Sequence, residues 1–215
     1  NALSDAVMMK FTTCTNITIK NPQINGNRAA QTPATASLHG LYFDGCNHVK
    51  IEGGKIHDTR GSGVRGRNTS NMHVLNAWVY DCSERHIYCA AANTGGVTTE
   101  NVCVEGCLVD VRGATTSADK DLTAISLSHN KSVIFDNVRA INNTVYHHPD
   151  NVGTATCITL AGAVNAVISG NIVINGHLAL STFKCTNVAI SNNTAANFGA
   201  IGVEVAHGNI DTVVS

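Results

Sequence analysis

The densest group of ionisable residues in this chain of 215 residues lies between positions 44 and 88. Three of its carboxylates, Asp58, Asp81 and Glu84, are candidates for catalysis. Two neighbouring carboxylates can serve as a general acid and its partner, which is the chemistry that breaks glycosidic bonds. The alternative is a solvated ion-pair network on a protein surface. Five other side chains in this stretch are candidates for holding a substrate: Asp44, Arg65, Arg67, His86 and Tyr88.

A repeat in the sequence indicates how these residues are positioned. Seven times, an Asn or Gly stands four residues after an aliphatic or methionine residue, which we call the anchor. The anchors are Ile17, Val49, Met72, Val102, Val133, Val167 and Val188, with Ile210 as an eighth. The matching turn residues are Asn21, Gly53, Asn76, Gly106, Asn137, Asn171 and Asn192. A unit of about 22 residues with insertions in some units predicts a solenoid.

Within each unit the apolar residues recur every second position, which is the period of a β-strand. One strand contains the anchor, a second follows the Asn or Gly, and a third precedes the anchor. Three short strands in each coil of about 22 residues predict an all-β fold, the right-handed parallel β-helix. Asn and Gly tolerate the left-handed backbone conformation of a tight corner, and stacked Asn side chains are expected to form a hydrogen-bonded ladder.

The repeat also predicts a carboxylate pair. Asp58 and Asp81 each lie five residues after their turn residue, so they are expected one coil apart, at about 5 Å. Like charges this close raise the pKa of one carboxyl group, which is one way to make a general acid.

Insertions in the repeat are expected to form loops at the corners, where binding and chemistry often occur. Two of these insertions, residues 112–121 and 143–151, lie between the second and third strands of a coil. Two others precede an anchor: residues 91–98, and residues 29–37 if this segment belongs to the same corner.

The composition agrees with this fold and limits the possible functions. Charged residues make up 13% of the chain, with 19 Gly and 3 Pro, which is typical of a strand-forming protein rather than a helical or disordered one. A net charge of −1 gives no electrostatic reason to bind nucleic acid or an anionic membrane. The sequence has no apolar run long enough to span a bilayer and no signal peptide. No terminal cap is visible, so we expect residues 1–215 to form one partial domain of a longer β-helix.

The eight cysteines are expected to be free thiols, because a large solenoid core does not require disulfides. A bridge between Cys14 and Cys46 is the alternative, since stacked positions lie near disulfide distance. No Cys or His spacing typical of a metal site is present.

Trp78 and Tyr80 are expected on an outer face. A long apolar row is unusual on a solvated surface, which predicts burial in a homotrimer. The residues of this row are Trp78, Leu108, Ile141 and Val173.

Two segments, Phe43 to Asp58 and Val167 to Ile174, resemble the right-handed β-helix repeats of the pectate-lyase superfamily, and especially those of bacteriophage tailspikes. The resemblance implies an elongated sugar-binding surface, a homotrimer in the tailspike case, and a location in a virion tail or outside the cell. The chain lacks the Gly-His-Gly and Asn-Thr-Asp elements of polygalacturonases and the Asp-Pro-His-Asp element of alginate epimerases.

Three functional hypotheses follow. The first is a tailspike-type glycosidase without a cofactor that binds and cleaves a bacterial surface polysaccharide, with the acid and its partner among Asp58, Asp81 and Glu84. The second is a lyase of the pectate type, with Arg65 as the base and a Ca²⁺ ion held by Asp44, Asp58 and Asp81. The third is an adhesin or structural solenoid that only binds.

Overall fold

A computed structural model describes residues 7–28, 38–91, 98–112, 123–129, 134–147, 156–199, 201–206 and 208–215. The regular elements in these segments are strands, and they form three parallel sheets of eight, eight and seven strands. No helix in this part of the chain is long and apolar enough to cross a membrane. The predicted parallel β-helix with three strands in each coil is therefore confirmed.

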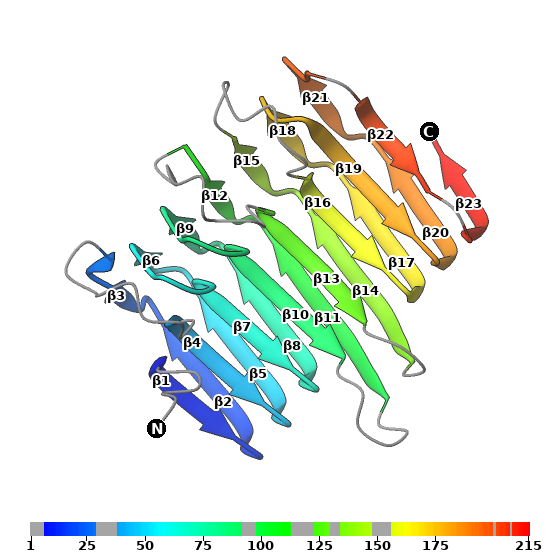
Figure 1. The fold of residues 1–215 in the computed structure, drawn as a ribbon. Helices are drawn as coiled ribbons and strands as arrows, with labels where there is room; N and C mark the ends of the chain where they lie inside the picture. The colour runs from blue at the N-terminus through cyan, green and yellow to red at the C-terminus, as the bar shows by residue number, and fades with distance from the viewer. Residues whose placement is uncertain are drawn as a thin grey trace, which may run out of the picture.

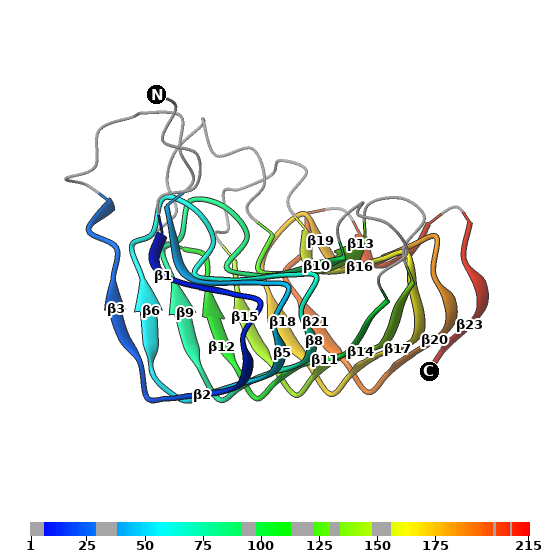
Figure 2. The ribbon, with the colours of Figure 1, turned by 90° about the horizontal axis from the view of Figure 1, so that it is seen from below.

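The chain passes through the three sheets in the same order in every coil (Figures 1 and 2). Sheet A contains β1 (Val7–Thr12), β4 (His39–Asp44), β7 (Val64–Arg67), β10 (Ile87–Ala91), β13 (Ile125–His129), β16 (Thr156–Ala161), β19 (Leu178–Phe183) and β22 (Ile201–Val205). Sheet B contains β2 (Thr15–Lys20), β5 (Asn47–Glu52), β8 (Ser70–Leu75), β11 (Thr99–Glu105), β14 (Phe135–Ile141), β17 (Ala163–Ser169), β20 (Thr186–Ser191) and β23 (Ile210–Val214). Sheet C contains β3 (Gln23–Asn25), β6 (Lys55–His57), β9 (Trp78–Tyr80), β12 (Leu108–Asp110), β15 (Thr144–Tyr146), β18 (Ile172–Ile174) and β21 (Thr194–Ala196).

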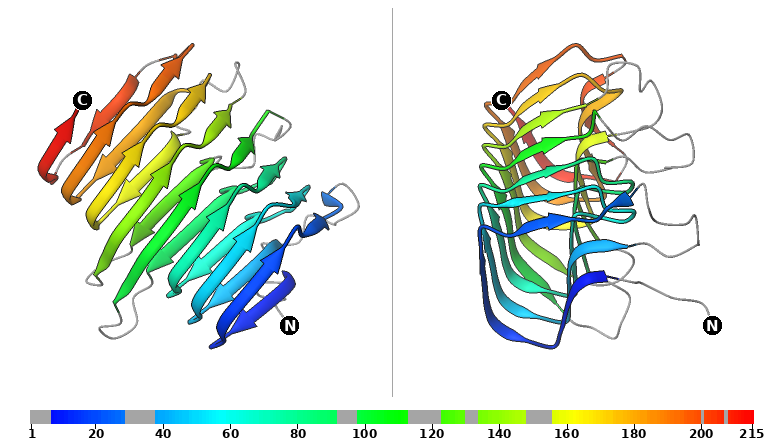
Figure 3. Two further views of the ribbon diagram at one scale, coloured as in Figure 1. Left: turned by 180° about the vertical axis from the view of Figure 1, so that it is seen from behind. Right: turned by 90° about the vertical axis from the view of Figure 1, so that its left-hand side faces the viewer.

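We name the bends between these sheets the A–B, B–C and C–A corners. Stacking of the coils along one axis is seen in Figure 3. Segment 29–37 follows β3 and precedes β4, so it belongs to the C–A corner and not to the corner before the anchors. Most residues of the four predicted insertions lie outside the described part of the chain.

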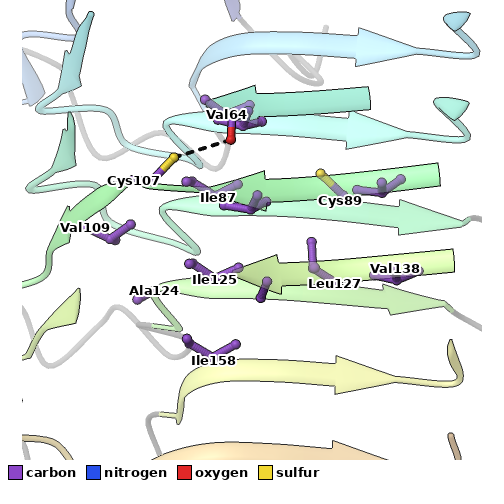
Figure 4. Close-up of a cluster of buried hydrophobic side chains, with 14 of the residues drawn as sticks. Val64, Ile87, Cys89, Cys107, Val109, Ala124, Ile125, Leu127, Val138 and Ile158 are labelled. Carbon is purple, nitrogen blue, oxygen red and sulfur yellow. Dashed lines mark hydrogen bonds between the residues drawn. The ribbon is translucent and has the colours of Figure 1, made fainter. Parts of the chain in front are cut away.

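The core is made of alternate side chains that point inward from each strand and stack in lines along the axis. One such line joins Val64, Ile87, Ile125 and Ile158, which are in register in neighbouring strands and are fully buried (Figure 4). Burying a Val or Ile side chain contributes about 1.5–3 kcal/mol. The solenoid is thus a continuous apolar interior with three outer faces on which polar side chains are held at fixed spacing.

The B–C corner is formed by the Asn and Gly column that the repeat predicts. Its residues have positive φ and are Asn21, Gly53, Asn76, Gly106, Asn142, Gly170 and Asn192. A Cβ atom on Gly53 would lie 2.4 Å from Oδ1 of Asn21, so glycine leaves room for the amide of the coil below. The prediction is confirmed for Asn21, Gly53, Asn76, Gly106 and Asn192.

The prediction is wrong for Asn137 and Asn171. Asn137 lies in the A–B corner, where its side-chain amide donates to Oδ1 of Asn101 over 2.6 Å. Asn171 is fully buried just after the B–C corner, in a second ladder with Asn143 and Asn193 and amide-to-oxygen distances of 2.9 Å.

The reason for these errors is that the four-residue spacing occurs twice in each of these coils, so the pairs Val133–Asn137 and Val167–Asn171 were read in place of Val138–Asn142 and Ala166–Gly170. A left-handed residue stands just before the anchor in every described coil of sheet B. Asn137 has a φ of 51° and interrupts the alternation of β14, so Phe135 and Val138 both face the core although they are three residues apart. Asn165 has the same effect on β17, where Ala166 and Ile168 point inward.

The anchors of these coils are thus Val138 and Ala166. Val133 lies outside the described residues, and Val167 points outward. In the last coil Ile210 pairs with Thr186, so Thr212 and not Ile210 is the partner of Val188.

The cysteines are all free, as predicted, and Cys14 and Cys46 form no bridge. Burial raises the pKa of Cys82, Cys89 and Cys107 to about 12. These thiols therefore stay protonated at neutral pH and behave as small apolar core residues.

Candidate functional site

The two predicted carboxylates, Asp58 and Asp81, lie at the C–A corner directly after β6 and β9. Their predecessors His57 and Tyr80 are in register, so the two carboxylates take equivalent positions in adjacent coils. Both have a φ of 52°, the left-handed conformation that Asp tolerates better than most residues. The stacking expected from the sequence is present in the structure.

The carboxylate of Asp58 is oriented by its neighbour. Nδ1 of His57 lies 2.7 Å from Oδ2 of Asp58, and the imidazole donates this hydrogen bond because an ionised carboxylate can only accept. The His57 ring is stacked on the Tyr80 ring, with 4.5 Å between centroids and 5° between planes. The imidazole is therefore fixed by a phenol on one side and a carboxylate at its edge.

Tyr80 lies near enough to both carboxylates to be affected by their charges. Burial raises the pKa of Tyr80, and the negative charges of Asp58 and Asp81 raise it further. The phenol is therefore protonated at neutral pH and can donate a hydrogen bond to an oxygen bound at this corner.

The next coil adds an ion pair that the sequence reasoning did not identify. Arg112 holds Asp110 with two bonds, Nε to Oδ1 at 2.9 Å and Nη2 to Oδ2 at 2.6 Å. Burial by itself would raise the pKa of Asp110, but the hydrogen bonds and charge of Arg112 outweigh it and hold the pKa below its usual value. Asp110 therefore remains ionised and is unsuited to the role of general acid.

Tyr146 extends this cluster by one more coil. Its ring lies 4.8 Å from the guanidinium carbon of Arg112, and it is in register with Asp110 and Tyr80. The sequence reasoning assigned Tyr146 to a corner insertion because the register of that coil was shifted. The signal that would have found it is the buried Val145 between Thr144 and Tyr146, which matches Val79 between Trp78 and Tyr80.

The outer face of sheet A carries most of the predicted substrate-binding residues. Tyr42, Arg65 and Tyr88 are in register on β4, β7 and β10, and the guanidinium carbon of Arg65 lies 5.0 Å and 5.8 Å from the two rings. Nε of Arg67 lies 4.0 Å from Oδ1 of Asp44 in the adjacent row. The structure therefore brings these residues together on one face, as expected.

Arg65 is also fixed from a neighbouring position. Its Nη1 contacts Nε2 of the buried His39, whose Nδ1 accepts a 2.8 Å hydrogen bond from the backbone of Ser62. The guanidinium is thus packed between two phenol rings and beside the His39 ring, which limits its rotamer freedom.

His86 was expected to hold a sugar, and this prediction is wrong. Its side chain is fully buried inside the solenoid, and its Nε2 accepts a 3.2 Å hydrogen bond from the backbone of Cys82. Burial lowers the pKa of His86 to about 3, so the ring is neutral. Glu84 is half-buried in the same corner segment between β9 and β10. The segment 81–86 turns inward before β10 begins, which the strand pattern alone could not indicate.

The predicted calcium site does not form from its three residues. Asp44 lies on the outer face of sheet A, whereas Asp58 and Asp81 follow strands of sheet C. Within the described segments, no group of three His, Cys, Asp or Glu side chains is arranged to hold a metal ion.

The predicted apolar row is also corrected. Trp78 and Leu108 are neighbours on the outer face of sheet C, but the next residues in register are Thr144 and Ile172. Val173 is fully buried in the core, and Ile141 belongs to β14 of sheet B; the shifted register of these coils explains both errors. The homotrimer remains a prediction, without this row as its basis.

Comparison with known proteins places the fold in a family. The family model described as "Right handed beta helix region" matches residues 4–118, more than half of the chain. The chain belongs to the right-handed β-helix family.

A similar solved structure is the crystal structure of DFA-IIIase from Arthrobacter chlorophenolicus A6 without its lid. The TM-score is 0.44 at 11% identity, and the match covers 93% of this chain and 63% of that one. This β-helix chain therefore spans less than two thirds of that structure's length. No curated protein matches the sequence.

Proposed function

We propose that this β-helix is a glycoside hydrolase of the tailspike type, which binds and cleaves a bacterial surface polysaccharide at the C–A corner. The observation that carries the proposal is the pair Asp58 and Asp81, stacked in adjacent coils beside a protonated phenol. The partly exposed side chains of Arg65, Arg67 and Tyr88 lie on the neighbouring face of sheet A and would bind the rest of the polysaccharide chain, whereas Tyr42 is buried behind Arg65 in contact with it.

The backbone spacing of the two corners is compatible with a retaining mechanism, in which the carboxyl groups lie close together. Adjacent parallel strands lie about 4.8 Å apart. Retaining glycosidases have carboxyl groups roughly 5–5.5 Å apart, whereas inverting enzymes need roughly 6.5–9.5 Å to admit a water molecule. In this proposal Asp58, which accepts the hydrogen bond of His57, is the nucleophile, and Asp81 is the acid and base. Glu84, in the same corner segment, is the second candidate for the acid.

The aromatic residues of sheet C would contact a sugar through their edges. The rings of His57 and Tyr80 stack on each other, and those of Trp78 and Tyr80 lie 4.6 Å apart, so their faces are largely used inside the protein. Lys55 lies 4.9 Å from the Trp78 ring. Hydroxyl groups of the substrate would therefore be recognised by hydrogen bonds from Tyr80 and the arginines rather than by stacking.

The test is incubation of the chain with a panel of capsular and O-antigen polysaccharides, followed by measurement of chain length. Asp58→Asn and Asp81→Asn should reduce turnover on the order of 10² to 10⁴-fold and leave the melting temperature nearly unchanged. Glu100→Gln is the matched control, because Glu100 is exposed on β11 of sheet B, away from the corner. Full cleavage by both Asp variants would contradict the proposal.

A second candidate is a solenoid that binds polysaccharide without cleaving it. It is favoured by the pairing of opposite charges on these faces, since Asp44 contacts Arg67 and Asp110 contacts Arg112. A carboxylate that is paired with an arginine stays ionised, so it is better suited to binding a substrate than to transferring a proton. Retention of a polysaccharide by the chain without any shortening would support this candidate against the hydrolase.

A further inference from the structure

A hollow of about 580 Å³ lies on the outer face of sheet B, over β2, β5 and β8, which are adjacent strands in Figure 1. This volume is in the range of small-molecule sites. It lies on a different sheet from the carboxylate pair and the sheet A face. Its lining residues are Asn16, Thr18, His48, Val49, Lys50, Asn71, His73 and Leu75.

Several polar side chains at this hollow have unused hydrogen-bonding capacity. In the described part of the chain, the side chains of Asn16 and Thr18 and the imidazoles of His48 and His73 form no hydrogen bond. Lys50 contacts Glu52, which does not line the hollow. The lining thus contains a cation, two imidazoles, two amides and a hydroxyl, and none of its residues is acidic.

His48 departs from the repeat at this position. It has a φ of 54° and occupies the A–B corner column, in which the left-handed residue is otherwise Asn or Asp in each described coil: Asn16, Asn71, Asn101, Asn137, Asn165, Asn187 and Asp211. The amides of Asn71 and Asn101 continue a ladder that begins at Asn47, with distances of 2.7 Å and 2.9 Å. The backbone N–H of His48 donates to Oδ1 of Asn47, but its imidazole takes no part in this ladder and lines the hollow instead. A residue kept in a less favourable conformation is an indication of function.

We propose that this hollow binds an acidic sugar unit, such as a hexuronate, through its carboxylate and its hydroxyl groups. Lys50 pairs with the carboxylate, at the expense of part of its contact with Glu52. Asn16, Thr18 and the two imidazoles bind the hydroxyl groups. An inorganic anion would leave these neutral groups unused, which favours a sugar.

The state of His73 agrees with this assignment. Burial lowers the pKa of His73, and the positive charge of Lys50 adds to the lowering. At neutral pH this imidazole is therefore uncharged, and it can accept one hydrogen bond and donate another, as a sugar hydroxyl requires.

The test is calorimetric titration of the chain with D-glucuronate, with D-glucose and with inorganic phosphate. We expect glucuronate to bind with a Kd on the order of 1 mM, and glucose and phosphate at least about tenfold more weakly. Lys50→Gln and His73→Gln should each weaken glucuronate binding at least about tenfold, whereas Lys55→Gln, an exposed lysine on sheet C, should leave it unchanged. Equal affinity for glucose or phosphate, or normal binding by Lys50→Gln, would overturn the proposal.

A second variant tests the role of His48 through stability as well as binding. His48→Asn restores the residue type of the column, so it should raise the melting temperature by about 1–3 °C while weakening glucuronate binding. Higher stability with unchanged binding would remove His48 from the site.

This site does not depend on the proposed cleavage. Asp58→Asn and Asp81→Asn should bind glucuronate normally, so failure of one proposal is distinguishable from failure of the other.

Discussion

At the scale of single residues, the left-handed corner positions decide which side chains reach the surface together. Asp58 and Asp81 share such a position, and Asn fills the same conformation in other coils, for example at Asn175 and Asn197 of the C–A corner. Asp→Asn substitutions here remove the charge without disturbing the corner. They are therefore cleaner probes of chemistry than Asp→Ala, which would add backbone strain.

The buried His86 predicts a dependence of stability on pH. Burial lowers its pKa to about 3 in the folded state, compared with about 6.5 in an unfolded chain. The unfolded state therefore binds more protons between these values, so the stabilising contribution is complete above about pH 6.5 and is lost as the pH falls toward 3. Chemical denaturation of the native chain and of His86→Gln across this range should show a weaker pH dependence in the variant. Parallel curves would show that His86 does not contribute.

At the scale of elements, the sequence predicts the strands well where the alternation is unbroken. The strands β4, β7, β10 and β16 are all found where the pattern predicts them, and in β7 and β10 buried and partly exposed residues alternate without interruption. The register fails at β14 and β17, because Val133–Asn137 and Val167–Asn171 have the same four-residue spacing as the true corner pairs Val138–Asn142 and Ala166–Gly170. The spacing alone cannot show which of the two pairs forms the corner.

The candidate site could be predicted only in part for the same reason. Asp58 and Asp81 were found because both follow an Asn or Gly turn at the same distance in two coils of regular register. Tyr146 was missed through the register error in its coil. Asp110 was not recognised because its role depends on Arg112, an ion pair that only the structure shows.

The buried Asn ladder predicts a large effect of one substitution. Asn171 accepts hydrogen bonds from the backbone and side chain of Asn143, and it donates to the Ala140 carbonyl and to Asn193. Asn171→Ala would leave these buried groups without partners, so unfolding should require about 2–4 kcal/mol less free energy in urea denaturation.

Asn192→Gly is the matched control, because glycine fills the same corner position at Gly170 in the coil before. It should change stability by less than about 0.5 kcal/mol. A similar loss in both variants would show that the ladder has no special importance.

At the scale of the whole molecule, the described coils form one continuous stack. β11 pairs with β8 on one side and with β14 on the other, and the sequence of pairings in sheet B has no gap. Each coil is stabilised mainly by its neighbours, as in other solenoids. The carboxylate pair and the sheet B hollow therefore depend on the same core although they lie on different sheets.

The last prediction tests this shared dependence. Val104 is fully buried in β11, so Val104→Asp places an unpaired charge in the core and should cost several kcal/mol, on the order of 3–5 kcal/mol. Val213→Asp, at a position that is 64% exposed in β23, is the control and should be nearly neutral. The chain has one tryptophan, Trp78 of β9, whose fluorescence reports on a single coil, whereas circular dichroism reports on all three sheets. If the stack is cooperative, both signals of Val104→Asp should be lost at the same urea concentration. Native Trp78 fluorescence in a chain that has lost half of its ellipticity would show instead that the coils on either side of β11 unfold independently.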